Sequence, residues 1–279
     1  MQSFLQCGRF QLSLERPLVM GIVNVTPDSF SDGNTHFRTD EAVAHGLRLI
    51  DEGADLLDIG GESTRPGAQA VTVDEELRRV LPVIQGLAEC GVPLSIDTCK
   101  PEVMRASVLA GADMINDIGG FTVPGAIDAV RDSACGLCLM HMLGEPRTMQ
   151  QDPDYGDVVA EVRDYLANGA RRLRDAGVSA DRIVLDPGFG FGKTVAHNYA
   201  LLRQLPQVMG DEYPSLIGLS RKSMIGAVTG RPADRRLGGS VAAALAGAMR
   251  GAHILRVHDV ADTVDALRVW SAVEQGVRA

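Results

Sequence analysis

The sequence is poor in aromatic residues, which make up 4% of its 279 residues and include a single tryptophan. Proteins that bind single-stranded nucleic acid stack the bases on aromatic side chains, so this composition argues against that function. An excess of basic residues is also missing: 27 Lys and Arg face 36 Asp and Glu, giving a net charge of −9. Because neutralising phosphates requires a basic surface, this balance argues against general nucleic-acid binding.

The sequence also lacks a long hydrophobic run and a secretion signal. Its most apolar segment covers residues 241–249, whereas a helix needs about 20 apolar residues to span a bilayer, so we expect no membrane partner. The N-terminus has no basic stretch followed by an apolar core. The cysteines number five, an odd count in a large chain, and predict no disulfide framework. We therefore expect a protein of the reducing cytoplasm.

Cys135 and Cys138 have the C-x-x-C spacing that redox and metal sites share. They lie in an apolar run typical of a buried strand, where side chains three residues apart point to opposite faces. A buried structural pair is the interpretation that this pattern favours.

Glycine is in excess, with 31 copies in an otherwise ordinary globular composition. Short β-branched runs recur along the chain, each followed by a segment of helical period. These runs predict eight strands, over residues 18–25, 55–60, 93–98, 113–118, 136–142, 182–186, 215–220 and 253–257. The predicted helices include residues 40–52, 73–90, 101–110, 158–176, 237–250 and 261–275.

Helix starts and stops support this segmentation. Thr39 and Asp40 are expected to cap the first helix, and Pro101 to open the third. Glycines are expected to end five helices, at Gly53, Gly91, Gly111, Gly177 and Gly251.

Eight strands alternating with helices predict an α/β fold, a single (β/α)8 TIM barrel over residues 1–279. A doubly wound parallel sheet also alternates strands and helices and is the competing architecture. The count of eight and the uniform composition favour the barrel. Residues 1–17 are expected to form a short hairpin, turning near Cys7 and Gly8, that caps the bottom of the barrel.

In such barrels the active site lies at the carboxyl ends of the strands, and every predicted strand here ends in polar residues. Acids and amides follow strands three, four and six, where Asp97, Asn116 and Asp186 could hold a heterocycle through its amino–imino edge. Strands seven and eight, where TIM barrels often bind phosphate, deliver the cations Arg221, Lys222, Arg256 and His258. The rim thus predicts a site for a polar heterocycle joined to a phosphate-like anion.

Residues 188–194, GFGFGKT, do not fit a phosphate-binding loop, because Pro187 stands where the Walker pattern requires glycine. A flexible rim loop that presents Phe189 or Phe191 to a flat ligand is the better interpretation. The small-residue loops after strands one and two are expected to close over a reaction that must exclude water.

Eight segments together resemble the motifs of the dihydropteroate synthase family of pterin-binding TIM barrels. They span nearly the whole chain in the expected order: MGIVNVTPDSFSDG (20–33), DIGGESTRPG (58–67), SIDTCKPEV (95–103), INDI (115–118), LMHM (139–142), LDPGFGFGK (185–193), GLSRKSMIG (218–226) and ILRVHDV (254–260). Cys99 stands where many relatives carry serine, and no matched functional position is lost.

The resemblance implies a transferase that condenses 6-hydroxymethyl-7,8-dihydropterin pyrophosphate with 4-aminobenzoate, forming 7,8-dihydropteroate and releasing pyrophosphate. It also implies a homodimer, a target of sulfonamides and a Mg²⁺ ion held through Asn24. By position, the pterin site would comprise Asp97, Asn116, Ile118, Met140, Asp186, Gly218 and Lys222. The pyrophosphate site would comprise Asn24, Arg65, Arg256 and His258, and the 4-aminobenzoate site Phe30, Thr64, Pro66, Phe191, Lys222 and Ser223. The residues implied in catalysis are Asp32, Asp97, Lys222 and Arg256.

The physical chemistry is compatible with that reaction. Cations and Mg²⁺ stabilise a pyrophosphate leaving group as its charge develops, and Asp32 would stabilise the pterin cation. A weakly basic arylamine needs no strong general base, and His141 is expected to be a packed residue. Three alternatives stay open: a methyltetrahydrofolate methyltransferase, which should lack the loops at 26–33 and 62–67, a Schiff-base aldolase using Lys222, and a protein that binds pterin without turnover.

Overall fold

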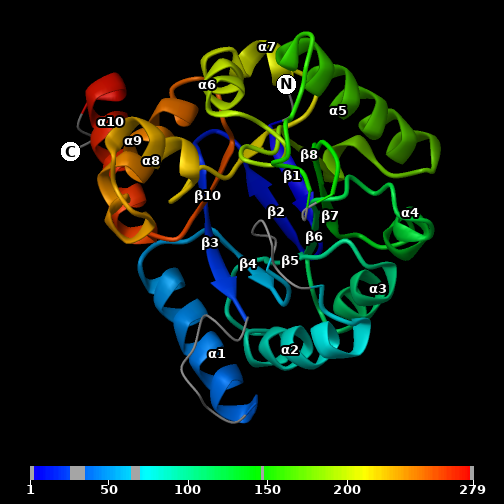
Figure 1. Cartoon of the computed structure of the whole chain (residues 1–279). Helices are drawn as coiled ribbons and strands as arrows, with labels where there is room; N and C mark the ends of the chain where they lie inside the picture. Colours follow the sequence, from blue (N-terminus) through cyan, green and yellow to red (C-terminus); the bar gives the residue numbers. More distant parts are fainter. Residues whose placement is uncertain (1–2, 26–34, 64–69, 146–147, 277–279) are drawn as a thin grey trace.

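The fold is a barrel of eight parallel strands surrounded by helices (Figure 1). The computed structural model describes residues 3–25, 35–63, 70–145 and 148–276. The barrel strands are β3 (Leu18–Asn24), β4 (Leu56–Gly60), β5 (Leu94–Asp97), β6 (Met114–Asp117), β7 (Gly136–Met140), β8 (Ile183–Asp186), β9 (Leu216–Ile217) and β10 (Ile254–Val257). Each falls within one of the ranges predicted from the sequence.

The order of the strands distinguishes the two architectures that the sequence left open. The sheet runs β8-β7-β6-β5-β4-β3-β10-β9, and a parallel bridge between Leu185 and Ser215 links its two end strands. The bridge closes the sheet into a ring, and the order contains no reversal of the kind that defines a doubly wound sheet. The prediction of a TIM barrel is confirmed.

In the described part of the chain, the helices that surround the barrel are α1 (Thr35–Asp51), α2 (Val73–Gly86), α3 (Pro101–Leu109), α4 (Ala126–Val130), α5 (Val158–Asp175), α6 (Val195–Arg203), α7 (Leu205–Met209), α8 (Ser223–Thr229), α9 (Leu237–Ala248) and α10 (Val260–Gln275). None of the helices in these ranges is long and apolar enough to cross a membrane.

The predicted helices are all found, with two differences at their ends: α2 stops at Gly86, five residues before Gly91, and α1 begins earlier than expected. Pro101 opens α3, and the five glycines expected to end helices all have positive φ. The cap predicted at Thr39 and Asp40 is wrong, because α1 already begins at Thr35. Thr and Asp cap a helix only at its first turn, and here they lie inside it.

The barrel strands are buried on both faces, and the two faces build separate apolar clusters. The larger cluster lies between the sheet and the helices and includes Cys135 and Phe189. The smaller one, which includes Cys138 and Met20, also contains Leu5 and Cys7 of the N-terminal segment. The two cysteines of the C-x-x-C pair thus lie in different clusters, and burial raises the pKa of each thiol. All five cysteines lie in the described residues and are free, as expected.

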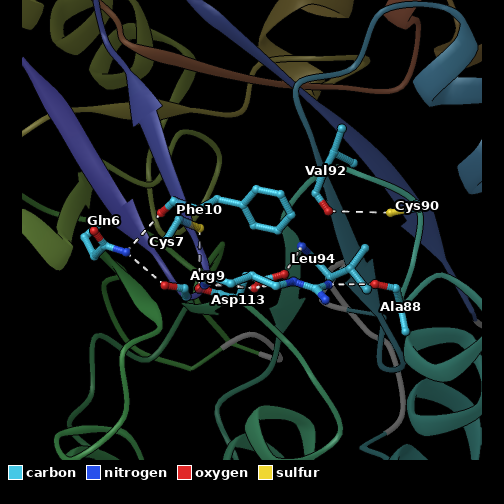
Figure 2. Close-up of polar contacts among 10 residues, drawn as sticks. Gln6, Cys7, Arg9, Phe10, Ala88, Cys90, Val92, Leu94 and Asp113 are labelled. Atoms are coloured by element: carbon cyan, nitrogen blue, oxygen red, sulfur yellow. Dashed lines mark hydrogen bonds and ion pairs between the residues drawn. The ribbon is translucent and has the colours of Figure 1, made fainter.

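The N-terminal hairpin packs across the barrel bottom and is anchored by Asp113. Its strands, β1 (Phe4–Cys7) and β2 (Phe10–Ser13), turn at Gly8 and Arg9 as predicted. Figure 2 shows Asp113 Oδ1 accepting from the backbone N–H of Arg9 at 3.4 Å, while Oδ2 accepts from the N–H of Leu94 at 3.1 Å. The Arg9 guanidinium lies 3.3 Å from Oδ1 and also donates to the carbonyl of Ala88 at 2.8 Å. A buried carboxylate therefore joins the hairpin to β5.

The close approach of the hairpin turn to Asp113 requires glycine at position 8. Gly8 has φ of +59°, and a Cβ there would lie 2.7 Å from the Asp113 Cα. We expect Gly8→Ala to lower the free energy of unfolding by roughly 3 kcal/mol, because the left-handed conformation and a backbone clash both oppose it. Gly230→Ala is the matched control, with φ of +67° and open space around the added Cβ. It should cost only about 1 kcal/mol in urea unfolding. Equal losses for the two variants would contradict the packing of the hairpin turn on Asp113.

Candidate active site

A row of paired residues crosses four neighbouring strands at the carboxyl end of the barrel, and three of them have polar side chains. In the strand register, Asn24 pairs with Gly60, Gly60 with Asp97, and Asp97 with Asn116. Residues paired across parallel strands lie at the same height along the barrel. The side chains predicted separately from the end of each strand therefore lie next to one another. The row confirms that Asn24, Asp97 and Asn116 come together at one rim.

A buried ion-pair network connects this row to β10. The Arg256 guanidinium donates through Nε to Asp58 Oδ2 at 2.6 Å and through Nη2 to Asp97 Oδ2 at 3.0 Å. Asp58 is fully buried and also accepts from Ser95 Oγ at 2.6 Å and from Asn116 Nδ2 at 3.1 Å. Asp58 therefore joins β4, β5, β6 and β10 at one point.

Asp58 lies in the predicted strand 55–60, but no role is predicted for it from the sequence. The available signal was a charged residue inside an otherwise apolar strand, LLDIG, all of whose residues are buried. Such a carboxylate requires a buried partner, but the sequence does not show that the partner is Arg256, 198 residues away.

Asn116, at the carboxyl end of β6, has an unused acceptor. Its Nδ2 donates to Asp58, so its Oδ1 is the free end of the amide. Oδ1 is buried and has no hydrogen-bond partner among the described residues. A buried acceptor without a partner is costly, and a ligand N–H would satisfy it.

Asp186 and Lys222 form the opposite side of the site. Asp186 is 5% exposed, and its Oδ1 accepts from the Gly188 N–H at 2.7 Å. Burial raises the pKa of Asp186, while the ammonium of Lys222 opposes that rise. Burial likewise lowers the pKa of Lys222 to about 8, and the Asp186 carboxylate limits the fall. Each of the two charges offsets part of the pKa shift that burial causes in the other. Together, the carboxylate and the ammonium can bind an N–H and a carbonyl of one polar ring.

Asp97 shows the same conflict between burial and pairing. Burial raises the pKa of Asp97, the Arg256 guanidinium lowers it, and the nearby Asp58 carboxylate raises it further. Burial also raises the pKa of Asp117, next to Asn116 on β6, to about 6. Perturbed carboxyl groups that gather in one place are typical of functional sites.

Apolar and glycine positions shape the remaining walls. Ile118 and Met140 are 6% and 3% exposed, and Met140 is the register partner of Asp186. Gly218 lies against the two cations, since a Cβ there would be 3.8 Å from the Arg256 Cβ and 3.9 Å from Lys222 Nζ. Met140 and Gly218 therefore belong to the same region as the charged groups, and Ile118 is buried directly after β6.

The two phenylalanines of the glycine-rich loop have different environments. Phe191 is half-buried, and Lys222 Nζ lies 4.9 Å from its ring centroid, a cation–π distance. Phe189 is fully buried in the core between the sheet and the helices. The option that Phe189 faces a ligand is therefore wrong, and Phe191 is the aromatic residue beside the site. Ser223, the first residue of α8, is exposed near Lys222.

The predicted anion-binding cations differ in how they are held. The Nδ1 of His258 lies 3.0 Å from Ser220 Oγ, and Arg221 pairs with Asp259 at 2.5 Å.

The other predicted site residues lie in ranges 26–34 and 64–69, outside the described residues: Phe30, Asp32, Thr64, Arg65 and Pro66.

A second ion cluster lies at the base of the segment 64–69. The ammonium of Lys100 pairs with Glu62 and with the fully buried Glu76, and Glu62 Oε1 accepts from the Val71 N–H at 3.0 Å. Residues on both sides of that segment are thereby tied together. Sequence reasoning missed this cluster, because the three charged residues are dispersed over 39 positions of the chain.

A TIM barrel whose rim combines buried acids, a free amide acceptor and paired cations is an enzyme site for a polar ring. The comparison with known families identifies the class: the family described as "pterin binding enzyme" matches residues 20–258. Among curated relatives, dihydropteroate synthase of Escherichia coli (strain K12) is 51% identical, with 94% of this chain and 93% of the relative covered. That of Neisseria meningitidis serogroup B is 52% identical, with 96% of each covered.

Solved structures agree with these relatives. Burkholderia cenocepacia dihydropteroate synthase complexed with 7,8-dihydropteroate is 61% identical, with a TM-score of 0.90 and 98% and 96% of the two chains covered. Xanthomonas albilineans dihydropteroate synthase with 4-aminobenzoic acid is 57% identical, with a TM-score of 0.93 and 99% of each chain covered. The chain belongs to the dihydropteroate synthase family.

The effect of burial and of nearby carboxylates on charge at the rim can be measured through the pKa values of the lysines. The chain contains only three lysines, Lys100, Lys193 and Lys222, so each signal can be assigned. A lysine loses its charge as the pH rises through its pKa, and burial lowers the pKa of Lys193 to about 7 and of Lys222 to about 8. Burial opposes the charge of Lys100 too, but its two glutamate partners raise its pKa above the ordinary value. In a ¹³C NMR titration of labelled lysine, the signals should therefore titrate in the order Lys193, Lys222, Lys100.

The variant Asp186→Asn tests the cause of that order. It should lower the pKa of both Lys193 and Lys222, since the Asp186 carboxylate raises both, and leave Lys100 unchanged. Asp259→Asn, which removes a rim carboxylate paired with Arg221, is the control and should move none of the three. An unchanged Lys222 signal in Asp186→Asn would refute the pairing.

Proposed function

We propose that this protein is a dihydropteroate synthase, the transferase that joins 6-hydroxymethyl-7,8-dihydropterin pyrophosphate to 4-aminobenzoate and releases pyrophosphate. The observation that carries the proposal is the free Asn116 acceptor between buried carboxyl groups, on a chain about half identical to named synthases over nearly its full length. An amino–imino ring edge offers the donors that Asn116, Asp97 and Asp186 can accept. Lys222 supplies a donor for a ring carbonyl.

Different residues act on the two ends of the pterin ester: Arg256 on the pyrophosphate, and the carboxylates on the pterin. As the bond from the pterin methylene carbon to the ester oxygen breaks, electrons move to the pyrophosphate and a cation forms on the pterin side. Arg256 uses Nε and Nη2 on Asp58 and Asp97, which leaves donors on both terminal nitrogens for phosphate oxygens. The carboxylates around the ring stabilise the cation that the arylamine nitrogen then attacks, and the amine releases its proton.

Mg²⁺ is the proposed cofactor, with Asn24 as its protein ligand. Among the described residues no cluster of three or more His, Cys, Asp or Glu side chains forms a metal cage, so the ion would depend on the substrate's own oxygens. The site fits such binding: Asn24 Oδ1 and Asp97 lie on either side of Gly60, where a Cβ would contact both at 3.9 Å and 3.7 Å. Bound there, Mg²⁺ would neutralise charge on the pyrophosphate oxygens.

The comparisons support the choice of this activity over the alternatives. The curated relatives and solved neighbours described above are named dihydropteroate synthases, which favours neither a methyltransferase nor an aldolase. A Yersinia pestis neighbour, 47% identical, is described in complex with a sulfonamide drug. We therefore propose that sulfonamides compete with 4-aminobenzoate for the surface beside Phe191 and Ser223.

We also propose that the enzyme acts in the cytoplasm as a homodimer. Helices α8, α9 and α10 lie side by side (Figure 1). Each has an exposed large apolar residue on it or directly after it. Val228, Met249, Val269 and Val273 are between 59% and 76% exposed. Exposed apolar residues that gather on adjacent helices are typical of a face covered by a second subunit.

Release of pyrophosphate by the purified protein tests the proposed activity. We expect stoichiometric pyrophosphate and 7,8-dihydropteroate when the pterin ester, 4-aminobenzoate and Mg²⁺ are all supplied. Omission of any one of the three should reduce the rate at least about a hundredfold, because the leaving group and the nucleophile are then not stabilised together. Folded protein that forms no dihydropteroate in the complete mixture would refute the assignment, and turnover without 4-aminobenzoate would indicate a hydrolase.

A further inference from the structure

The positions of the lysines point to a part of the site that the proposed mechanism does not use. The chain has 24 arginines and three lysines, and each lysine follows the carboxyl end of a barrel strand: Lys100 after β5, Lys193 after β8 and Lys222 after β9. Lys100 and Lys222 are half-buried, whereas Lys193 is 3% exposed. Its ammonium touches no carboxylate of the described residues, so its burial requires another explanation.

The surroundings of Lys193 match the geometry of an ammonium group. Its Nζ lies 2.9 Å from each of three acceptors, the carbonyls of Gly188 and Phe191 and the Nδ1 of His141. Three acceptors at this distance use the three N–H bonds of a protonated lysine. A fourth contact, to the carbonyl of His141, is longer at 3.4 Å.

His141 completes the arrangement as a neutral acceptor. Burial and the charge of Lys193 lower the pKa of His141 to about 3, so its Nδ1 carries a lone pair toward the ammonium. The imidazole ring packs edge-on against Tyr165, with centroids 4.8 Å apart. These contacts explain why His141 is a packed residue at a rim otherwise made of ligand-binding groups.

The hydrogen bonds of Lys193 belong to a loop in which every carbonyl from 188 to 192 has a partner. Lys193 donates to the carbonyls of Gly188 and Phe191. Lys222 donates to that of Phe189, and Gln150 to that of Gly190. The fifth, of Gly192, accepts from the Tyr155 hydroxyl at 2.8 Å. The loop predicted to be flexible is thus held at each peptide, and Lys193 fixes both ends of the turn that carries Phe191.

We propose that Lys193 is a positioning residue that fixes the 4-aminobenzoate pocket by holding the 188–192 loop, without touching either substrate. This inference rests on the proposed function, since Phe191 is the wall of that pocket. Lys193 sets the orientation of the Phe191 ring against Lys222 through the Phe191 carbonyl. Asp97 and Asn116 of the pterin site lie on β5 and β6, away from this loop. Asp186 and Lys222 do contact the loop, through the Gly188 N–H and the Phe189 carbonyl, but Lys193 makes neither of these bonds. Loss of Lys193 should therefore affect one substrate more than the other.

The test compares Lys193→Met with Arg182→Met, a control at the opposite end of the same strand. Arg182 precedes β8, is 7% exposed and donates to the carbonyls of Cys135, Val130 and Arg131 at 2.8–3.0 Å. Both variants remove a buried cation that holds backbone carbonyls, but only Lys193 lies at the rim. Lys193→Met should raise the KM for 4-aminobenzoate about tenfold and leave the KM for the pterin ester within about threefold. Arg182→Met should lower Tm and change neither KM.

Hydrogen exchange gives a readout that does not depend on catalysis. In Lys193→Met the amides of residues 188–192 should exchange faster, while those of β5 and β6 stay protected. Tyr155→Phe, which removes only the bond to Gly192, is a milder variant if Lys193→Met does not fold, and it should change exchange and KM in the same direction. Equal increases in both KM values, or faster loop exchange with unchanged KM values, would overturn the inference. An inactive wild-type protein would refute the proposed function instead, and the exchange data would still decide whether Lys193 holds the loop.

Discussion

The site depends on one buried interaction, the contact of the Arg256 guanidinium with Asp58 and Asp97. It brings together strands far apart in the sequence and sets the charge at the centre of the rim. Asp58 and Asp97 are buried and Arg256 is half-buried, so their charges cost desolvation free energy that only good geometry and additional hydrogen bonds offset. Ser95 and Asn116 supply those bonds to Asp58, and Asn116 Oδ1 is left without a partner among the described residues. One network thus determines which polar atoms remain free to bind.

The two ends of the barrel apply the same physical principle to different purposes. At the bottom, Asp113 and Arg182 are buried charges whose hydrogen bonds go to backbone groups, and these bonds join the hairpin and the strand beginnings into one body. At the top, Lys193 does the same for a loop beside the ligand site. Strand β8 connects the two ends of the barrel. Arg182, directly before this strand, and Lys193, in the loop after it, both donate to backbone carbonyls. Stability and positioning are therefore separable along a single strand.

Much of this could be predicted from the sequence, because strand and helix periods and the polar residues at strand ends are local signals. All eight strands were found in that way, and so were Asp97, Asn116 and Asp186 at the rim. Contacts between distant residues could not be predicted, because the partner of Asp58 is 198 positions away. Lys193 was considered only as part of the segment GFGFGKT, which does not fit a phosphate-binding loop. The same limit explains the ambiguity between Phe189 and Phe191. Both flank Gly190, and only the path of the chain decides that the first enters the core. The cap expected at Thr39 was wrong because a local preference does not show where a helix begins.

A crystal structure of the protein bound to 7,8-dihydropteroate would test the central claim most directly. The account predicts that the pterin ring lies between Asn116 and Asp186, with a ring N–H donating to Asn116 Oδ1 and the Arg256 guanidinium still on Asp58. Lys222 Nζ should leave the Phe189 carbonyl for the ring, and the aminobenzoate group should lie beside Phe191. A ligand bound elsewhere on the barrel, or a bound ring that leaves Asn116 Oδ1 without a partner, would contradict the account.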